Sequence, residues 1–259
     1  MSGSILNLFS LQGKTAIITG GTGGIGLAIT TALAEAGANI ISIEVPHDPA
    51  SPLLRQAIEA TGRKITVYDC NLKDHESIRA TFHAIWASGS VPDILVNCAG
   101  ITRHMKVEDT PVQDLDDVMA INFRGTYLCI QEFGRELLRL QRPGKIINFA
   151  SIAAFLAQTN ISAYCSSKAA VQNLTRAVSN EWAGKGITCN AICPGFIHTK
   201  MCEDLYTDKE FSARVVARTS MGRWGEPEDI RGLAVFLASA ASDFITGESV
   251  FVDGGIMGR

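Results

Sequence analysis

Positive charge is scarce in this 259-residue sequence, which has 23 Lys and Arg against 26 Asp and Glu and a formal net charge of −3. No run of Lys or Arg reaches three residues. This argues against the basic surfaces typical of proteins that bind nucleic acids or anionic membranes. Charged residues are few at 19% and hydrophobic residues make up 46%, so the chain can bury a core and is not expected to be disordered.

The long apolar runs of a membrane protein are also missing. The N-terminal segment MSGSILNLFSLQGK has no basic region, and its apolar stretch is too short for a signal peptide. The longest uncharged stretch, residues 146–167, is interrupted by polar residues such as Asn148 and Gln158. No membrane partner or membrane span is therefore expected.

Paired cysteines and clustered histidines are likewise absent. The seven cysteines are odd in number, are spread along the chain and form no CxxC pair, and no HxxxH or HxH spacing occurs. We therefore expect free, mostly buried thiols and no metal site. Free thiols are typical of a reducing compartment, so we expect a cytoplasmic protein.

Short β-branched runs alternate with helical patterns along the whole chain. Strands are predicted at 15–19, 39–43, 65–68, 94–96, 145–149, 187–192 and 249–252, and helices at 24–36, 75–87, 115–140, 163–183 and 227–238. This alternation predicts an α/β fold with a parallel sheet covered by helices on both faces. We expect one domain over 1–259 with a short N-terminal tail at 1–10 and a loop at 46–52. Residues 196–221 are interpreted as either a surface excursion or a mobile lid.

A glycine-rich segment, TGGTGGIG at 19–26, joins the first predicted strand to the first predicted helix. Glycines allow a tight turn and let backbone N–H groups approach a pyrophosphate, which the positive end of the following helix also attracts. A merely tight turn is the alternative. The candidate cofactor-binding residues here are Gly20, Thr22, Gly24, Ile25 and Gly26.

Glu44 closes the second predicted strand. An acid at this place can accept hydrogen bonds from the adenosine ribose hydroxyls of NAD, and its charge would repel a 2′-phosphate. We therefore predict NAD as the preferred cofactor. NADP stays possible through later basic residues such as Arg63 and Lys64, and a solvated loop acid is the alternative reading of Glu44.

Five motifs, counting the glycine loop, together point to one family. They are the glycine loop itself, NCAG at 97–100, Asn122, Ser151 followed by Tyr164-x-x-x-Lys168, and PG at 194–195. Together, from about residue 11 to 255, the chain resembles the short-chain dehydrogenases/reductases. That resemblance implies a doubly wound, seven-stranded Rossmann fold. The departure is Cys98, which stands where the family motif NNAG has its second Asn.

The resemblance assigns catalytic roles to four residues. Tyr164 is the expected acid/base, because a hydride transfer at an alcohol carbon also needs a proton removed or supplied. Lys168 lies one helical turn from Tyr164, and its charge, with that of the oxidised nicotinamide, is expected to lower the pKa of Tyr164. Ser151 is expected to donate to the substrate oxygen, and Asn122 to hold a water behind Lys168.

The same resemblance implies further cofactor contacts. Ile197 and Thr199 match the segment that contacts the nicotinamide carboxamide, and Asp69 matches an acid that contacts adenine, although a turn-forming Asp is an equal alternative. The remaining expected cofactor-binding residues are Asn97, Ala99, Gly100, Tyr164, Lys168, Pro194 and Gly195.

Two late motifs narrow the expected substrate. GRWGEP at 222–227 and VDGG at 252–255 are similar to the gluconate and 2-deoxygluconate dehydrogenase branch. If functional, Arg103 and His104 would bind polar or anionic substrate groups, and His198 and Phe155 would border the same region. We expect an oxidoreductase acting on a secondary alcohol or ketone of a sugar acid or polyol. The alternatives are an NADPH-dependent ketoreductase for acyl or secondary-metabolite ketones and a non-redox cofactor-binding protein.

Self-association is also expected. The predicted helix 115–140 carries too many apolar side chains for a single stripe against its own sheet. In the family, the corresponding helix pairs with the one at 163–183 across a two-fold axis. We therefore expect a homo-oligomer, with a tetramer as first choice and a dimer as second.

Overall fold

The computed structural model describes residues 4–259 and contains one parallel sheet of seven strands. The strands are β1 (Thr15–Thr19), β2 (Asn39–Glu44), β3 (Ile65–Asp69), β4 (Ile94–Asn97), β5 (Gly144–Phe149), β6 (Ile187–Pro194) and β7 (Ser249–Val252). Their order is β3-β2-β1-β4-β5-β6-β7. All seven strand predictions are confirmed, and the predicted doubly wound α/β fold is correct.

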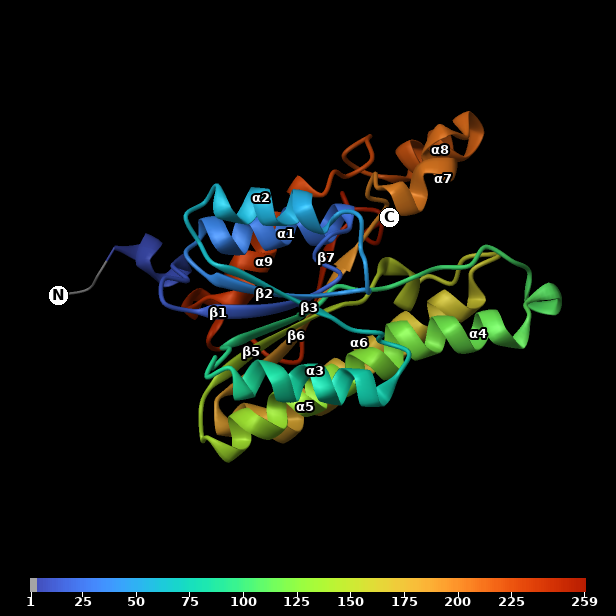
Figure 1. The fold of residues 1–259 in the computed structure, drawn as a ribbon. Coiled ribbons are helices and arrows are strands. Elements are labelled where there is room, and N and C mark those ends of the chain that lie inside the picture. The colour runs from blue at the N-terminus through green and yellow to red at the C-terminus, as the bar shows by residue number, and fades with distance from the viewer. Residues whose placement is uncertain (1–3) are drawn as a thin grey trace.

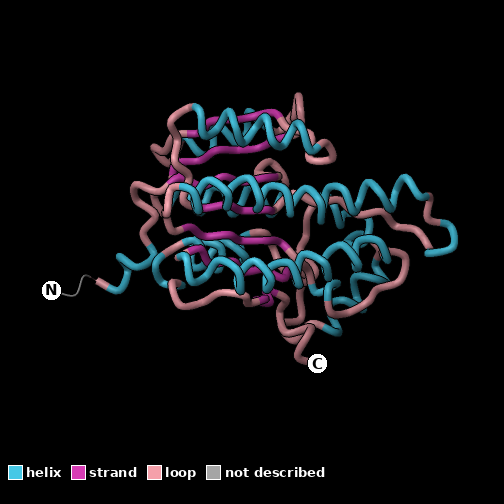
Figure 2. The backbone as a smooth tube through the Cα atoms, turned by 90° about the horizontal axis from the view of Figure 1, so that it is seen from below, coloured by secondary structure: helices cyan, strands magenta, loops and turns pink. Residues whose placement is uncertain are grey.

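Nine α-helices connect and cover the strands in the described part of the chain. They are α1 (Gly24–Glu35), α2 (Ser51–Glu59), α3 (His75–Ala87), α4 (Val112–Met119), α5 (Thr126–Arg139), α6 (Ser162–Trp182), α7 (Glu203–Thr207), α8 (Lys209–Arg218) and α9 (Glu228–Ala238). Helices α1, α2 and α9 lie on one face of the sheet, and α3, α5 and α6 lie on the other (Figure 1). The turned view in Figure 2 shows the helices running alongside the strands.

Burial on both faces explains why the central strands are so apolar. Neighbouring residues of β1 point to opposite sides: Ile18 packs with Ile29 and Leu237 in one core, and Ile17 packs with Phe133 in the other. A parallel sheet covered on both faces needs such continuous apolar runs. The edge strand β3 is instead only partly buried.

Two predicted boundaries need correction. The loop expected at 46–52 ends early, because α2 begins at Ser51 with Pro52 in its first turn, where proline is well accepted. The helix expected at 115–140 begins at Val112 and is divided between α4 and α5 by a π-helical segment, Ala120–Gly125. Of the predicted tail, Ile5–Phe9 form a 3-10 helix, and residues 1–3 lie outside the described residues.

The region 196–221 is largely helical, although its sequence indicated no regular element. It contains α7 and α8, which project from the body of the molecule beyond the sheet (Figure 1). Aromatic contacts link its parts, since the ring of Phe196, just after β6, lies 5.8 Å from that of Phe211 in α8 and 5.4 Å from that of Trp224.

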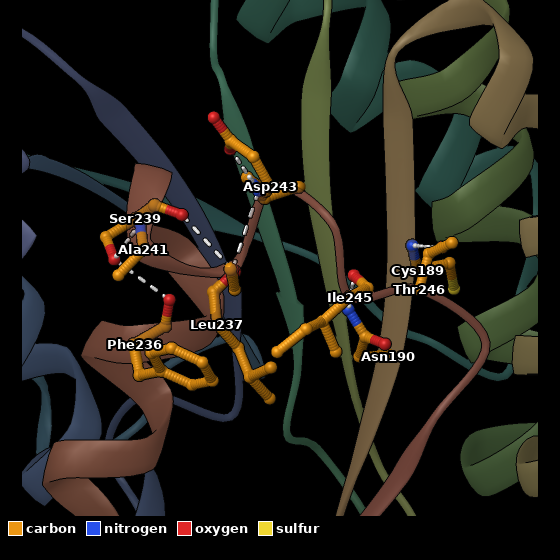
Figure 3. Close-up of polar contacts among 11 residues, drawn as sticks. Cys189, Asn190, Phe236, Leu237, Ser239, Ala241, Asp243, Ile245 and Thr246 are labelled. Atoms are coloured by element: carbon orange, nitrogen blue, oxygen red, sulfur yellow. Dashed lines mark hydrogen bonds and ion pairs between the residues drawn. The ribbon is translucent and has the colours of Figure 1, made fainter. Parts of the chain in front are cut away.

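The turn between α9 and β7 is fastened to β6 by polar contacts (Figure 3). Asn190 donates from Nδ2 to the carbonyl oxygen of Ile245 over 2.8 Å, and the Cys189 amide donates to Oγ1 of Thr246 over 3.1 Å. At the end of α9, Ser239 accepts from the Ala241 amide. These contacts set the register in which β7 joins the sheet.

The strand order reverses between β1 and β4. In open α/β sheets, the crevice beyond the carboxyl ends of the strands at such a reversal is where ligands bind. The glycine loop after β1 and the NCAG turn after β4 therefore meet at this crevice.

Candidate active site

A cavity of about 500 Å³ occupies the crevice at the carboxyl ends of the strands. It brings together most of the predicted site residues, although they come from the ends of five strands and from α6. Those that line it are Gly20, Thr22, Gly24, Ile25, Gly26, Glu44, Ala99, Gly100, Ser151, Tyr164, Lys168, Pro194, Gly195, Ile197 and Thr199. Asp69, Asn97 and Asn122 lie outside this lining.

The glycine loop leaves no room for side chains at two of its positions. A Cβ on Gly26 would overlap the carbonyl oxygen of Gly20. Gly20 itself has φ +71°, and a Cβ there would lie 2.8 Å from Cα of Ala99. The loop is thus packed against the NCAG turn, and Gly23, which precedes α1, has no side chain to cap the helix. Backbone N–H groups at this helix start remain free to bind a phosphate.

The opposite side of α1's start meets the segment that follows β6. A Cβ on Gly24 would lie 3.1 Å from Cγ2 of Thr199. Gly195 is also tightly packed, because a Cβ there would lie 2.7 Å from Cα of Asp253. The start of α1 and the segment after β6, which are both predicted to bind the cofactor, therefore lie in contact with each other and line the same cavity.

Glu44 is a buried acid with an unused acceptor. Its side chain is 4% exposed and lines the cavity, and its Oε1 has no hydrogen-bond partner among residues 4–259. A buried carboxylate oxygen without a donor is costly, so a ligand that supplies one fits the site. The hydroxyl groups of a ribose have the required chemistry, and the glycine loop next to Glu44 fits a pyrophosphate.

Ser151, Tyr164 and Lys168 come from two elements. Ser151 follows β5, and its Oγ accepts from the Ala153 amide over 3.1 Å. Tyr164 and Lys168 lie one turn apart on α6. Lys168 Nζ donates to the carbonyl oxygen of Phe149 over 2.7 Å and lies 5.5 Å from the centroid of the Tyr164 ring.

Burial controls the protonation of this pair. It raises the pKa of Tyr164 to about 12, against a hydrogen bond from Ser151 that lowers it. It also lowers the pKa of Lys168 to about 8. The predicted lowering of the Tyr164 pKa is thus not a property of the chain alone, because the buried ring is desolvated and the lysine ammonium is directed to Phe149. The prediction also counted the positive charge of oxidised nicotinamide, which the chain does not supply.

Asn122 lies in the π-helical segment and is saturated by hydrogen bonds to the chain. Its Nδ2 donates to the Ile101 carbonyl over 2.9 Å and to Ser167 Oγ over 3.0 Å, and its Oδ1 accepts from the Ile101 amide over 2.8 Å. A Cβ on Gly100 would lie 3.3 Å from Oδ1 of Asn122 and 3.4 Å from Nζ of Lys168. The side chain therefore fastens Ile101, directly after the NCAG turn, beside the lysine. The expected role of Asn122 in holding a water stays a prediction.

Asn97 and Asp69 occupy different places from the rest. Asn97 is buried and donates from Nδ2 to Oδ1 of Asn148 over 2.9 Å, which links β4 to β5 below the cavity. Asp69 ends β3 and is exposed, while the following residues, beginning with Cys70, line the cavity.

Cys98, the departure from the family motif, lines the cavity. Burial raises the pKa of its thiol to about 12, although the Lys168 charge opposes this. The group is therefore a neutral thiol near pH 7, and its reactivity as a nucleophile is low.

The residues expected to border the substrate lie outside the cavity lining. Arg103 is exposed and pairs through Nε with Asp114 over 3.4 Å. His198 stacks on Tyr206 with ring centroids 3.8 Å apart, and Phe155 packs on a neighbouring aromatic ring. His104 is exposed.

Sequence reasoning missed several residues that line the cavity. Asp48 lies in the expected loop 46–52, and Lys200, Met201 and Cys202 lie in the region 196–221. The sequence marked 46–52 as a loop and 196–221 as a surface excursion or a mobile lid, but no signal indicated which of their residues line the cavity.

Comparisons with known proteins agree with this geometry. The family model described as enoyl-(acyl carrier protein) reductase matches residues 20–257. The 2-dehydro-3-deoxy-D-gluconate 5-dehydrogenase of Pseudoalteromonas atlantica is 39% identical over 98% of this chain and 100% of its own length. The enzyme of the same name from Bacillus subtilis is 39% identical over 99% of this chain and 100% of its own length.

A solved structure is similar throughout. The gluconate 5-dehydrogenase of Burkholderia cenocepacia in complex with NADP and tartrate has a TM-score of 0.94 and 36% identity, covering 98% of this chain and 99% of its own. The chain belongs to the short-chain dehydrogenases/reductases, the NAD(P)-dependent oxidoreductases that its motifs predicted. Within residues 4–259, every helix is too short or too polar to span a bilayer.

Proposed function

We propose that the chain transfers a hydride between a nicotinamide cofactor, with NAD preferred, and a secondary alcohol or ketone of a sugar acid. The observation that carries this proposal is that Ser151, Tyr164 and Lys168 line the same cavity as the glycine loop and Glu44. When bound, the nicotinamide accepts or supplies the hydride.

The chain's own residues handle the proton and the oxygen. In the oxidative direction, the tyrosinate form of Tyr164 accepts the proton of the substrate hydroxyl, and in the reductive direction protonated Tyr164 gives its proton to the ketone oxygen. Ser151 donates to that oxygen and stabilises negative charge on it. The Lys168 cation lowers the cost of a tyrosinate, and Asn122 holds the NCAG turn so that Lys168 keeps its position.

The assignment of a sugar acid draws on the relatives, which are named for gluconate and its dehydrated keto derivative. A cation in the region 196–221 also supports a sugar acid as substrate, since Lys200 lines the cavity and can pair with the carboxylate of such a substrate. We take residues 196–221 as a lid that closes on the substrate and 1–259 as a single domain.

The preference for NAD draws on Glu44. A charge-assisted hydrogen bond from a ribose hydroxyl contributes roughly 1.5–3 kcal/mol, and a 2′-phosphate would instead meet like charge. Lys73, a cation in the cavity lining, is already paired with Asp117 at 2.8 Å. The similar Burkholderia structure contains NADP, so NADP is the alternative that the test must decide.

Self-association is part of the same proposal. Leu115, Tyr127 and Leu140 are 42%, 45% and 37% exposed on the surface that α4 and α5 present. We propose that a second copy covers this surface across a two-fold axis in a tetramer, with a dimer as the alternative. With seven free cysteines, we also propose a cytoplasmic location.

Reduced nicotinamide absorbance provides the test. The protein is assayed with sugar acids, polyols and simple ketones, each with NAD(H) and with NADP(H), and Tyr164→Phe serves as the inactive control. The expected result is the highest kcat/KM on a sugar acid with NAD(H). No turnover on any sugar acid would overturn the substrate class, and equal or better kcat/KM with NADPH would overturn the role of Glu44.

A further inference from the structure

Asp48 is an acid of the cavity lining that is held rigidly in place. It lies in the loop between β2 and α2, where both of its carboxylate oxygens are bonded. Thr22 Oγ1 donates to Oδ2 over 2.7 Å, and the Ala50 amide donates to Oδ1 over 2.9 Å. The first of these bonds ties the β2–α2 loop directly to the glycine loop.

The backbone around Asp48 is also fixed. Its amide donates to the carbonyl oxygen of Val45 over 3.2 Å, and its carbonyl accepts from the Ser51 amide over 3.2 Å. His47 has φ +60°, a left-handed conformation that a non-glycine residue adopts only when its surroundings hold it there. The carboxylate is therefore set in one position rather than swinging on a free loop.

This arrangement has two consequences for an anionic ligand. A hydroxyl group has a single proton to donate, and Thr22 gives it to Asp48, so Thr22 cannot donate to a phosphate. In addition, the Asp48 charge joins that of Glu44, whose buried Oε1 has no partner within residues 4–259, at the same cavity. The carboxylates of Glu44 and Asp48 can accept hydrogen bonds from neutral hydroxyl groups of a ligand. They repel an added phosphate, to which the Thr22 hydroxyl cannot donate.

We propose that Asp48 is a second determinant of cofactor choice, which holds the glycine loop through Thr22 and excludes a phosphate on the adenosine 2′-oxygen. The proposal rests on the proposed nucleotide site of this cavity and adds a residue to it. Glu44 would recognise the ribose hydroxyls. Asp48 would act as a fixed negative charge and, through its hydrogen bond with Thr22, would hold the glycine loop in place; this hydrogen bond is called the strut below.

Nucleotide fragments test the proposal without catalysis. ADP carries the NAD-like ribose, and adenosine 2′,5′-bisphosphate carries the additional 2′-phosphate. Calorimetric Kd values for both are measured on the full-length protein and on Asp48→Asn, Thr22→Val and Glu44→Gln. Glu59→Gln is the matched control, because it removes an exposed acid of α2 that lies outside the cavity lining.

In Asp48→Asn the amide oxygen can still accept from the Ala50 amide, and Nδ2 can donate to Oγ1 of Thr22, so the variant removes the charge and keeps a hydrogen bond between the two loops. We expect it to tighten binding of the bisphosphate about 3- to 10-fold relative to ADP, as removal of one nearby like charge allows. Thr22→Val removes the strut and keeps the charge. We expect it to weaken both ligands about 2- to 5-fold, with their ratio unchanged. Glu59→Gln should leave both Kd values as in the original protein.

The outcomes separate this proposal from the proposed function. If Glu44→Gln changes the ratio of the two Kd values and Asp48→Asn does not, the role of Asp48 is refuted and that of Glu44 stands. If the original protein binds neither fragment, the nucleotide site itself is refuted. If Asp48→Asn does not fold, Thr22→Val still decides, because unchanged Kd values there would refute the strut.

Discussion

Lys168→Met should weaken function and strengthen the fold, because the lysine is a buried cation. Lys168 is 4% exposed, and its Nζ has the Phe149 carbonyl oxygen as its acceptor at 2.7 Å. Methionine is of similar length and has no charge to desolvate. We expect the variant to lose activity and nucleotide affinity, since Lys168 is proposed to lower the cost of a tyrosinate and is also one of the expected cofactor-binding residues that line the cavity.

The stability effect follows from the pKa. Burial lowers the pKa of Lys168 from its ordinary 10.5 to about 8. At about 1.4 kcal/mol per pKa unit, holding the proton in the folded state costs about 3 kcal/mol relative to the unfolded chain. Because the unfolded chain binds the proton more tightly, this cost is fully present below pH 8 and is relieved as pH rises from 8 towards 10.5.

The loss of one hydrogen bond opposes this gain in the free energy of unfolding. Methionine leaves the Phe149 carbonyl without its donor, at a cost of about 1–3 kcal/mol. The net gain at pH 7 should therefore be about 1 kcal/mol. The opposing term does not depend on pH, so the difference in unfolding free energy between variant and original should fall by about 2 kcal/mol between pH 7 and pH 10.

Urea unfolding of the cofactor-free protein, followed by tryptophan fluorescence at pH 7 and pH 10, measures this difference. Protein concentration must be the same throughout, because association shifts apparent stability. Lys185→Met, which replaces an exposed lysine, is the control and should show no such pH dependence. A stability difference for Lys168→Met that is the same at both pH values would refute the reasoning, since burial would then not control this lysine.

Three further predictions concern the site, the glycine loop and the assembly. Tyr164→Phe should lower kcat on the order of 10²- to 10⁴-fold with little change in NAD affinity, measured by steady-state kinetics and calorimetry, because it removes the proton-transfer group and keeps the ring. Gly26→Ala should abolish nucleotide binding in the same calorimeter, because its Cβ would overlap the Gly20 carbonyl. Gly232→Ala lies on α9, where an added Cβ would have no neighbour within 4 Å among residues 4–259. This variant should bind the nucleotide normally, and its free energy of unfolding should rise by about 0.5–1 kcal/mol. Light scattering should return a multiple of the 27.7 kDa chain mass, and an active species at that mass itself would contradict the proposed assembly.

The strands and the order of motifs were predictable because their signals are local. Seven β-branched runs bounded by turns specify a parallel sheet, and the glycine loop is recognisable from its own spacing. The start of α2 was not predictable in the same way. Its Pro52 reads as a loop residue in isolation but is accepted in the first turn of a helix, where its missing N–H is not needed.

The protonation of the site was not predictable from spacing. Tyr164 and Lys168 at i and i+4 share a helix face, which local geometry dictates. Whether the pair is buried, and to which acceptor the ammonium points, depends on β5 and on the NCAG turn, which pack against α6 from distant parts of the chain. That packing raises the pKa of Tyr164 in the chain by itself. The predicted lowering also counts the positive charge of oxidised nicotinamide, and it stays a prediction for the cofactor-bound protein.

Asn122 shows how a local pattern and a tertiary contact can disagree at a functional position. The apolar pattern around it specifies an uninterrupted helix, yet the backbone widens to a π-helix over Ala120–Gly125. Its side chain donates to and accepts from the backbone of Ile101, which anchors the segment to the NCAG turn. π-Helical bulges occur often at functional sites, because one widened turn can turn a side chain toward a partner that regular geometry would not reach. The irregular segment therefore contains the residue whose hydrogen bonds to Ile101 fasten the NCAG turn beside Lys168, and a sequence pattern that specifies only a helix face does not reveal that contact.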